Sequence, residues 1–189
     1  MDVEEVAGEG DEALVALARE GFSGAFEELV RRHQTRAHTL AARMVGDRHE
    51  AADVTQEAFV KAWTALPGFD GRASFSTWLY RIVVRESLSS HRRRARRPVP
   101  VEEDPARPVL ERPGAERTEA LVEQRVREEA LRSAVRALPE DQRAALVLTA
   151  FLEMEHAEAA EVLETTPDAV RGRAARARRT LLREMEDWA

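Results

Sequence analysis

The chain has 189 residues, a mass of 21.2 kDa, a formal charge of −6 and no cysteine. Its length suits one or two small domains, and the lack of thiols excludes disulfides, cysteine-ligated zinc and thiol catalysis. Because no apolar run approaches the roughly 20 residues of a membrane span and the acidic N-terminus is unlike a signal peptide, we expect a soluble, cytoplasmic protein without membrane insertion.

The first half of the chain has the apolar spacing of helices. An acidic segment over 1–22, expected to be partly helical, precedes two stretches with apolar residues three and four positions apart, the second of which ends at Gly46. Asp47 is a typical N-cap for the helix that follows. The inward stripe of that helix is expected to contain Ala51, Val54, Ala58, Phe59, Ala62 and Trp63.

A loop, a long helix and a linker come next. Residues 66–74 are rich in proline and glycine, which favours a loop. A helix is expected over 75–96, with Ser74 or Ser76 as its N-cap. Five of the eight prolines then fall within 98–117, together with several acids, and this spacing predicts an extended linker.

The second half, from residue 118, is also helical in pattern. Helices are expected over 118–137 and 139–152, followed by a short helix over 155–163 and a last helix that Thr166 caps. A short helix, a three-residue turn and a basic helix form the helix-turn-helix pattern. Since no segment alternates with a period of two, we predict an all-α fold with two small helical domains joined by the acidic, proline-rich linker.

Basic residues gather in two islands of an otherwise acidic chain. Residues 81–97 contain seven arginines and one acid, and residues 171–183 contain six arginines and no acid. Two such islands indicate two contacts with a polyanion such as nucleic acid. The alternative is that they are solvated faces that complement helix dipoles.

Four motifs resemble those of the extracytoplasmic-function, or group IV, sigma factors of bacterial RNA polymerase. They are DVTQEAFVKAW (53–63), LPGFDGRASFSTWLYRI (66–82), LPEDQRAALVL (138–148) and VRGRAARAR (170–178). The resemblance implies sigma region 2 over 23–97 and sigma region 4 over 118–189, with the linker 98–117 between them. It also implies a protein that binds core polymerase, recognises the −10 and −35 promoter elements and helps to melt DNA. The linker would then hold the two arginine-bearing helices apart at the separation of these elements.

Family knowledge assigns roles in the first domain to matching positions. The residues implied to bind the β′ clamp helices of core polymerase are Asp53, Gln56, Glu57, Phe59 and Lys61. Those implied to contact −10 DNA, in part by holding a flipped base in the 66–74 loop, are Phe69, Asp70, Arg72, Ser74, Arg81, Arg85, Ser89, Arg92 and Arg93.

In the second domain, the helix after Leu138 resembles the segment that packs on the β flap. The residues implied to contact −35 DNA are Thr165, Thr166, Arg171, Arg173, Arg176 and Arg178. The family also implies an anti-sigma factor as a protein partner. No phosphate loop, metal-ligand cluster or nucleophile–base set is present in the sequence, so we expect no enzyme, no cofactor and no metal.

Five positions depart from the usual family pattern. In the first domain, Arg85 replaces a common asparagine and Ser89 a frequent aspartate. In the second domain, Glu153 and Glu164 replace usual glycines and Glu155 replaces a usual serine or threonine cap. These acids leave open a polymerase-bound adaptor with impaired −35 reading. A stand-alone helix-turn-helix transcriptional regulator, which needs only the last two helices, is the other alternative.

Overall fold

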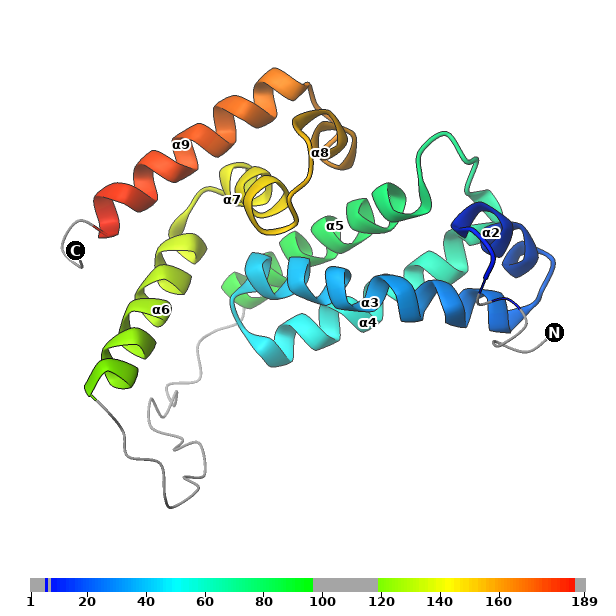
Figure 1. Cartoon of the computed structure of the whole chain (residues 1–189), viewed down its shortest axis with the longest axis horizontal. Helices are drawn as coiled ribbons and strands as arrows, with labels where there is room; N and C mark the ends of the chain where they lie inside the picture. Colours follow the sequence, from blue (N-terminus) through cyan, green and yellow to red (C-terminus); the bar gives the residue numbers. More distant parts are fainter. Residues whose placement is uncertain (1–5, 7, 97–118, 186–189) are drawn as a thin grey trace, which may run out of the picture.

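The computed structural model describes residue 6 and residues 8–96 and 119–185. Every regular element within these ranges is a helix, and none of those helices is long and apolar enough to cross a membrane. Figure 1 shows their arrangement. The helices are α2 (Asp11–Arg19), α3 (Ser23–Val45), α4 (Arg48–Ala65), the 3-10 turn η1 (Leu66–Gly68), α5 (Phe75–Arg96), α6 (Glu119–Ala137), α7 (Glu140–Leu146), the π-helical turn η2 (Val147–Phe151), α8 (His156–Val162) and α9 (Pro167–Met185).

Three helices begin at the caps that the sequence predicts. The carboxylate of Asp47 accepts a hydrogen bond from the Glu50 N–H at 2.8 Å, and the Ser74 hydroxyl accepts one from the Thr77 N–H at 3.1 Å. The Thr166 hydroxyl accepts one from the Ala169 N–H at 3.2 Å. These bonds satisfy N–H groups that the first helical turn leaves without a partner.

Two predicted elements differ in detail from the structure. Most of the apolar residues before Gly46 lie on one continuous helix, α3, because no helix-breaking residue interrupts it. The helix expected over 139–152 is helical through Phe151, but its geometry changes from α to π at η2, and Pro139 is its N-cap rather than its first residue. The predicted linker 98–117 lies outside the described residues.

In the first half of the structure, α3, α4 and α5 pack on one another, and α2 packs against α3. These helices pack on one another through the apolar faces that the spacing of the sequence predicts. On α4, five of the six residues expected to face inward are buried. Trp63 is the exception. Its side chain is 43% exposed and packs on Phe26, with ring centroids 4.9 Å apart.

In the second half, α9 packs against α7, α8 and α6. The buried face of α9 consists of Val170, Ala174 and Ala177, with Leu181 partly covered, as the spacing predicts. The short turn between α8 and α9 completes a helix-turn-helix. Its outer surface therefore carries the arginines of α9.

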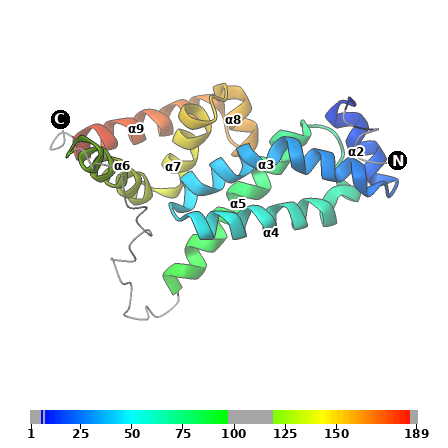
Figure 2. The same ribbon diagram turned by 60° about the horizontal axis from the view of Figure 1, so that its bottom comes forward.

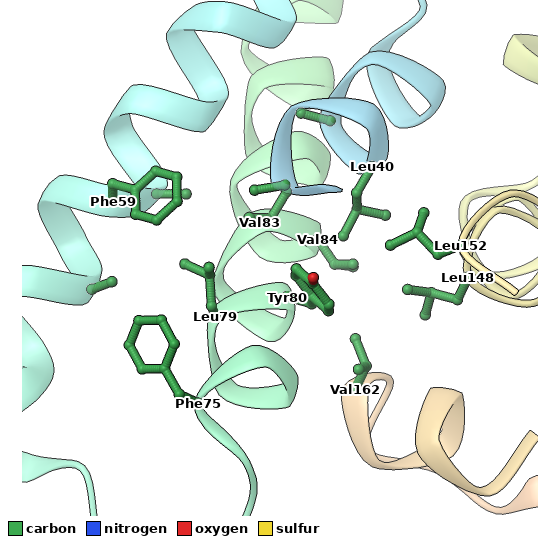
Figure 3. Packing of buried hydrophobic residues seen from close by; sticks show 14 of the residues in the cluster. Leu40, Phe59, Phe75, Leu79, Tyr80, Val83, Val84, Leu148, Leu152 and Val162 are labelled. Carbon is green, nitrogen blue, oxygen red and sulfur yellow. The ribbon is translucent and has the colours of Figure 1, made fainter. Parts of the chain in front are cut away.

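The two halves share one hydrophobic core rather than standing apart. Figures 1 and 2 show α7 and α8 beside α3 and α5, and α8 contacts α5 directly. In Figure 3, Tyr80 of α5 faces Leu148, Leu152 and Val162 of the second half. Apolar surface of both halves is thus buried between them in this structure, which describes no residue of the predicted linker.

Two arginines of the second half cover the C-terminal end of α3. The buried Arg143 donates to the Met44 carbonyl at 2.6 Å, and Arg136 donates to the Gly46 carbonyl at 3.4 Å. The last carbonyls of a helix lack intrahelical donors, and cations there also favour the helix dipole. Burial lowers the pKa of Arg143. These contacts join the two halves through polar as well as apolar groups.

The burial of Glu28, near the start of α3, was not predicted from the sequence, although two arginines follow it at the i,i+3 and i,i+4 spacing of helical ion pairs. Glu28 is fully buried and accepts hydrogen bonds from Arg31 at 2.6 and 2.7 Å and from Arg32 at 2.7 Å. Hydrogen bonds from Arg31, then from Arg32, lower the pKa of Glu28 from 4.5 to about 2. Arg32 and His33 also contact Asp11 of α2, so this cluster ties α2 to α3.

Replacing Glu28 with glutamine is expected to lower the midpoint of thermal unfolding by a few degrees at neutral pH. The folded pKa lies below the ordinary value, so the ionised carboxylate stabilises the fold above pH 4.5 and loses this effect as the pH falls toward about 2. Circular-dichroism melts across this range should show the gap between wild type and E28Q closing on acidification. The exposed neighbour variant E27Q is the control, and a pH-independent gap would contradict the assignment.

Candidate polymerase and nucleic-acid interface

The exposed face of α4 carries the polar residues singled out in the sequence. Asp53, Gln56, Glu57 and Lys61 are all exposed. The Lys61 ammonium lies 2.7 Å from the Glu86 carboxylate of α5 and 3.5 Å from Glu57. The contact with Glu86 is the main cause of the raised pKa of Lys61. This face is therefore partly organised by an ion pair to the neighbouring helix.

Phe59 differs from its polar neighbours because it is almost fully buried. It lines a shallow groove of about 480 Å³ between α3 and α4, together with Gln56 of the same helix and Val30 of α3. Contact by a partner protein at Phe59 would have to occur through this groove. The structure thus brings Phe59 to the edge of the exposed α4 face rather than onto it.

Two apolar side chains on α4 that were not predicted to lie on this face extend it. Val60 is 54% exposed and Trp63 is 43% exposed. They follow Gln56 at four and seven positions, which places all three on one side of the helix. This spacing could have predicted that Val60 and Trp63 lie on the same side of α4 as Gln56, but Trp63 was expected to face the core.

In the loop after η1, two of the predicted DNA-contacting residues pair with each other. The carboxylate of Asp70 accepts from the Arg72 N–H at 3.1 Å and from its guanidinium. The backbone bond, then the guanidinium, lower the pKa of Asp70. Phe69 is buried against Trp78, with ring centroids 4.9 Å apart, and Ser74 caps α5. Only Asp70, Arg72 and Ser74 of this set lie at the surface.

The arginines of α5 meet the second half of the chain. Arg81 donates to the Glu161 carbonyl at 2.8 Å, and both oxygens of Glu164 lie 2.8 Å from one nitrogen of Arg85. Farther along α5, Arg92 lies 3.7 Å from the Glu140 carboxylate and donates to the Ser89 hydroxyl at 3.3 Å. Arg93 is exposed. Three of the four α5 arginines predicted to contact −10 DNA thus contact the second half of the same protein.

On α9 and the turn before it, the predicted −35 residues remain largely accessible. Arg171 pairs with Asp168 of the same helix at 2.9 Å, and Arg173 pairs with Asp141 of α7 at 3.2 Å. The exposed members of the set are Thr166, Arg171, Arg176 and Arg178, whereas Thr165 and Arg173 are partly covered. The arginines therefore form an exposed basic strip along the helix.

The acids that depart from the family pattern occupy distinct places. Glu153 and Glu164 both adopt left-handed backbone conformations, with φ of 58° and 51°. Glu155 is the N-cap of α8, and its side chain forms no capping bond. Among the residues that the structure describes, no cluster of three or more histidines and acids could hold a metal ion.

Comparison with known proteins matches both halves to parts of one family. Residues 29–97 match sigma-70 region 2, and residues 128–181 match sigma-70 region 4. The chain is 35% identical over 183 residues to the RNA polymerase sigma-H factor of Pseudomonas aeruginosa, covering 92% of each chain. It is 34% identical over 176 residues to the ECF RNA polymerase sigma-E factor of Escherichia coli K12, covering 90% of this chain and 92% of that one.

A solved structure extends the likeness to three dimensions. The structure of CnrH in complex with the cytosolic domain of CnrY matches with a TM-score of 0.69 at 32% identity. The match covers 95% of this chain and 99% of CnrH. It therefore includes both helical halves.

Proposed function

This chain belongs to the extracytoplasmic-function sigma factors of the sigma-70 family, and from that premise we propose which ligand each of its two domains binds during promoter-specific transcription initiation. Sigma factors are non-catalytic subunits that bind core RNA polymerase and DNA. The observation that carries the division is the order of the matched regions, region 2 over 29–97 and region 4 over 128–181. The surface features of each domain then indicate which part of polymerase or promoter DNA it is proposed to bind.

The exposed face of α4 is proposed to bind the β′ clamp helices of core polymerase. Asp53 and Gln56 support this role because both are exposed, and within the described ranges neither side chain forms a hydrogen bond. Val60 and Trp63 would add apolar area beside them. Partly exposed aromatic side chains with polar neighbours are typical of protein interfaces.

The loop after η1 and the helix α5 are proposed to bind and hold the melted −10 element. Their arginines would contact phosphates, and Asp70, Arg72 and Ser74 would line a site for an unpaired base. Phe69 packs on Trp78 in the core, so a stacking role for its ring would require the loop to rearrange. Arg81, Arg85 and Arg92 would have to leave their present contacts to reach DNA.

The turn before α9 and its basic strip are proposed to bind the −35 element. Thr165, Thr166 and Arg171 lie nearest the start of the helix, where a recognition helix meets base edges, and Arg176 and Arg178 would reach phosphates. Arg173 would do so after releasing Asp141. The helix α7 is proposed to pack on the β flap.

An anti-sigma factor is proposed as a regulatory partner. The support is that the related CnrH, whose match covers 95% of this chain, was solved in complex with the cytosolic domain of CnrY. A partner that bound the exposed surfaces of α4 and α9 would block the binding of polymerase and promoter.

Run-off transcription with purified core polymerase on a library of promoter sequences tests the proposal. We expect initiation that depends on this chain and selects a pair of sequence elements. Transcription from all templates without selection, or none with any template, would contradict the proposed roles.

Replacing Arg171 with alanine is expected to cost about 1–3 kcal/mol of binding at one −35 base pair, and to relax selectivity there. The residue lies in the first turns of α9 and its only described ion pair, with Asp168, is exposed. Binding titrations on duplexes that vary each −35 position provide the measurement. An unchanged profile would instead favour the adaptor with impaired −35 reading.

A further inference from the structure

The helix α2 packs against the part of the structure that carries the loop between η1 and α5. It contacts η1 and α5 as well as α3, and it lies at the loop end of these helices in Figure 1. It precedes residues 29–97, which match sigma-70 region 2. The guanidinium of Arg19, the last residue of α2, donates to the Pro67 carbonyl of η1 at 3.4 Å. One end of α2 therefore contacts the segment from which the loop starts.

The other end of α2 is connected to the start of α5 through a histidine of α3. The carboxylate of Asp11, the first residue of α2, accepts a hydrogen bond from His33 Nε2 at 2.6 Å. The His33 ring packs on the ring of Phe75, the first residue of α5, with centroids 5.3 Å apart. Only 13% of the His33 side chain is exposed. The hydrogen bond from Asp11 thus fixes the orientation of a ring that supports the end of the loop.

Aromatic rings hold the loop at both of its ends. Phe69 precedes and Phe75 follows residues 70–74, and both phenylalanines are buried. Each ring contacts Trp78 of α5, with centroids 4.9 Å apart for Phe69 and 5.8 Å apart for Phe75. A continuous series of contacts therefore runs from Asp11 through the His33 ring to the residues on either side of the loop.

From these contacts we infer that Asp11 and His33 are positioning residues for the loop that is proposed to hold an unpaired −10 base. The inference rests on the proposed −10 role of this loop. Neither residue lies in the loop, so each acts through Phe75 and not on the base itself. A loop that is already held in its binding conformation loses less conformational entropy when the base enters, and its polar groups discriminate between bases more sharply.

A second partner of Asp11 has to be separated from this effect. Arg32 lies 3.2 Å from the Asp11 carboxylate, but it also pairs with Glu28 at 2.7 Å and would keep that contact without Asp11. The variants D11A and H33F both remove the hydrogen bond between Asp11 and His33, and H33F keeps an aromatic ring beside Phe75. If Asp11 acts on the loop through His33, the double variant D11A/H33F should perturb the loop no more than H33F alone.

Two measurements on the full-length chain test the inference. Hydrogen exchange of a peptide that spans residues 66–76, followed by mass spectrometry in the free protein, reports on local opening of the loop. Binding of single-stranded −10 oligonucleotides, each with one base replaced, is measured in the presence of core polymerase and reports on base discrimination. The control is E12A, which removes the exposed carboxylate next to Asp11 on the same helix.

We expect D11A and H33F to speed exchange in the loop peptide and to reduce base discrimination about two- to tenfold, the range that one hydrogen bond spans. E12A should match the wild type in both measurements. Equal loop exchange in D11A and E12A, faster exchange that extends to α9, or additive effects in the double variant would each overturn the inference. Faster loop exchange with unchanged base discrimination would support the positioning role and contradict the −10 role of the loop.

Discussion

Replacing Asp53 and Gln56 together with alanine is expected to weaken binding to core polymerase by about 2–4 kcal/mol, or roughly 30- to 1,000-fold. Both side chains are exposed on α4 beside the apolar Val60 and Trp63. Residues at the centre of such a surface contribute most of the binding energy at interfaces. The fold should be unaffected, because neither side chain forms a hydrogen bond with another residue in the described ranges.

Affinity is measured by titrating labelled chain with core polymerase, and the same variant is assayed in run-off transcription. E12A, an exposed change of equal charge on α2, is the control and should bind as the wild type does. A variant that keeps wild-type affinity would show that polymerase docks elsewhere. A variant that binds normally but initiates poorly would assign the face to a later step.

Replacing Leu148 with alanine is expected to destabilise the protein by about 2–5 kcal/mol, since the side chain is fully buried in the core that joins the two halves. Native domains are stable by only about 5–15 kcal/mol, so the effect should be large. If one core unites the halves, unfolding should be a single transition with a lower midpoint, both for L148A and for L79A in the first half.

Denaturant unfolding followed by circular dichroism measures this effect. L182A makes the same chemical change at a side chain that is 68% exposed on α9 and should shift the free energy of unfolding by less than about 0.5 kcal/mol. Two separate transitions, with L148A shifting one and L79A the other, would show that the halves unfold independently and that their shared interface contributes little.

Much of the helical framework was predictable because its signals are local. Asp47, Ser74 and Thr166 cap the helices at which their side chains stand, and the buried stripe of α9 follows helical spacing. The expected α geometry was not observed at η2, where tertiary contacts intervene. The π turn η2 packs against α3, and this contact cannot be inferred from the residues that adjoin η2 in the sequence.

The family was predictable from the residues of the candidate site, whereas the surroundings of these residues were not. Its residue types and spacing identify the family, and the matches to regions 2 and 4 confirm that identification. Periodicity placed Phe59 and Trp63 on one inward stripe of α4. It could not show that Phe59 would be nearly buried beside a groove while Trp63 would be almost half exposed on Phe26, because that depends on how α3 crosses α4.

The amino-acid order alone thus determined the helices, their caps, the two basic islands and the family, since each depends on residues within a few turns of one another. Only the tertiary structure decided which partners the charged side chains contact. Arg85 and Glu164, Lys61 and Glu86, and Arg143 and the Met44 carbonyl are far apart in the chain. Helical periodicity tells which side of a helix faces solvent, but the partner that reaches that side is set by the packing of whole helices.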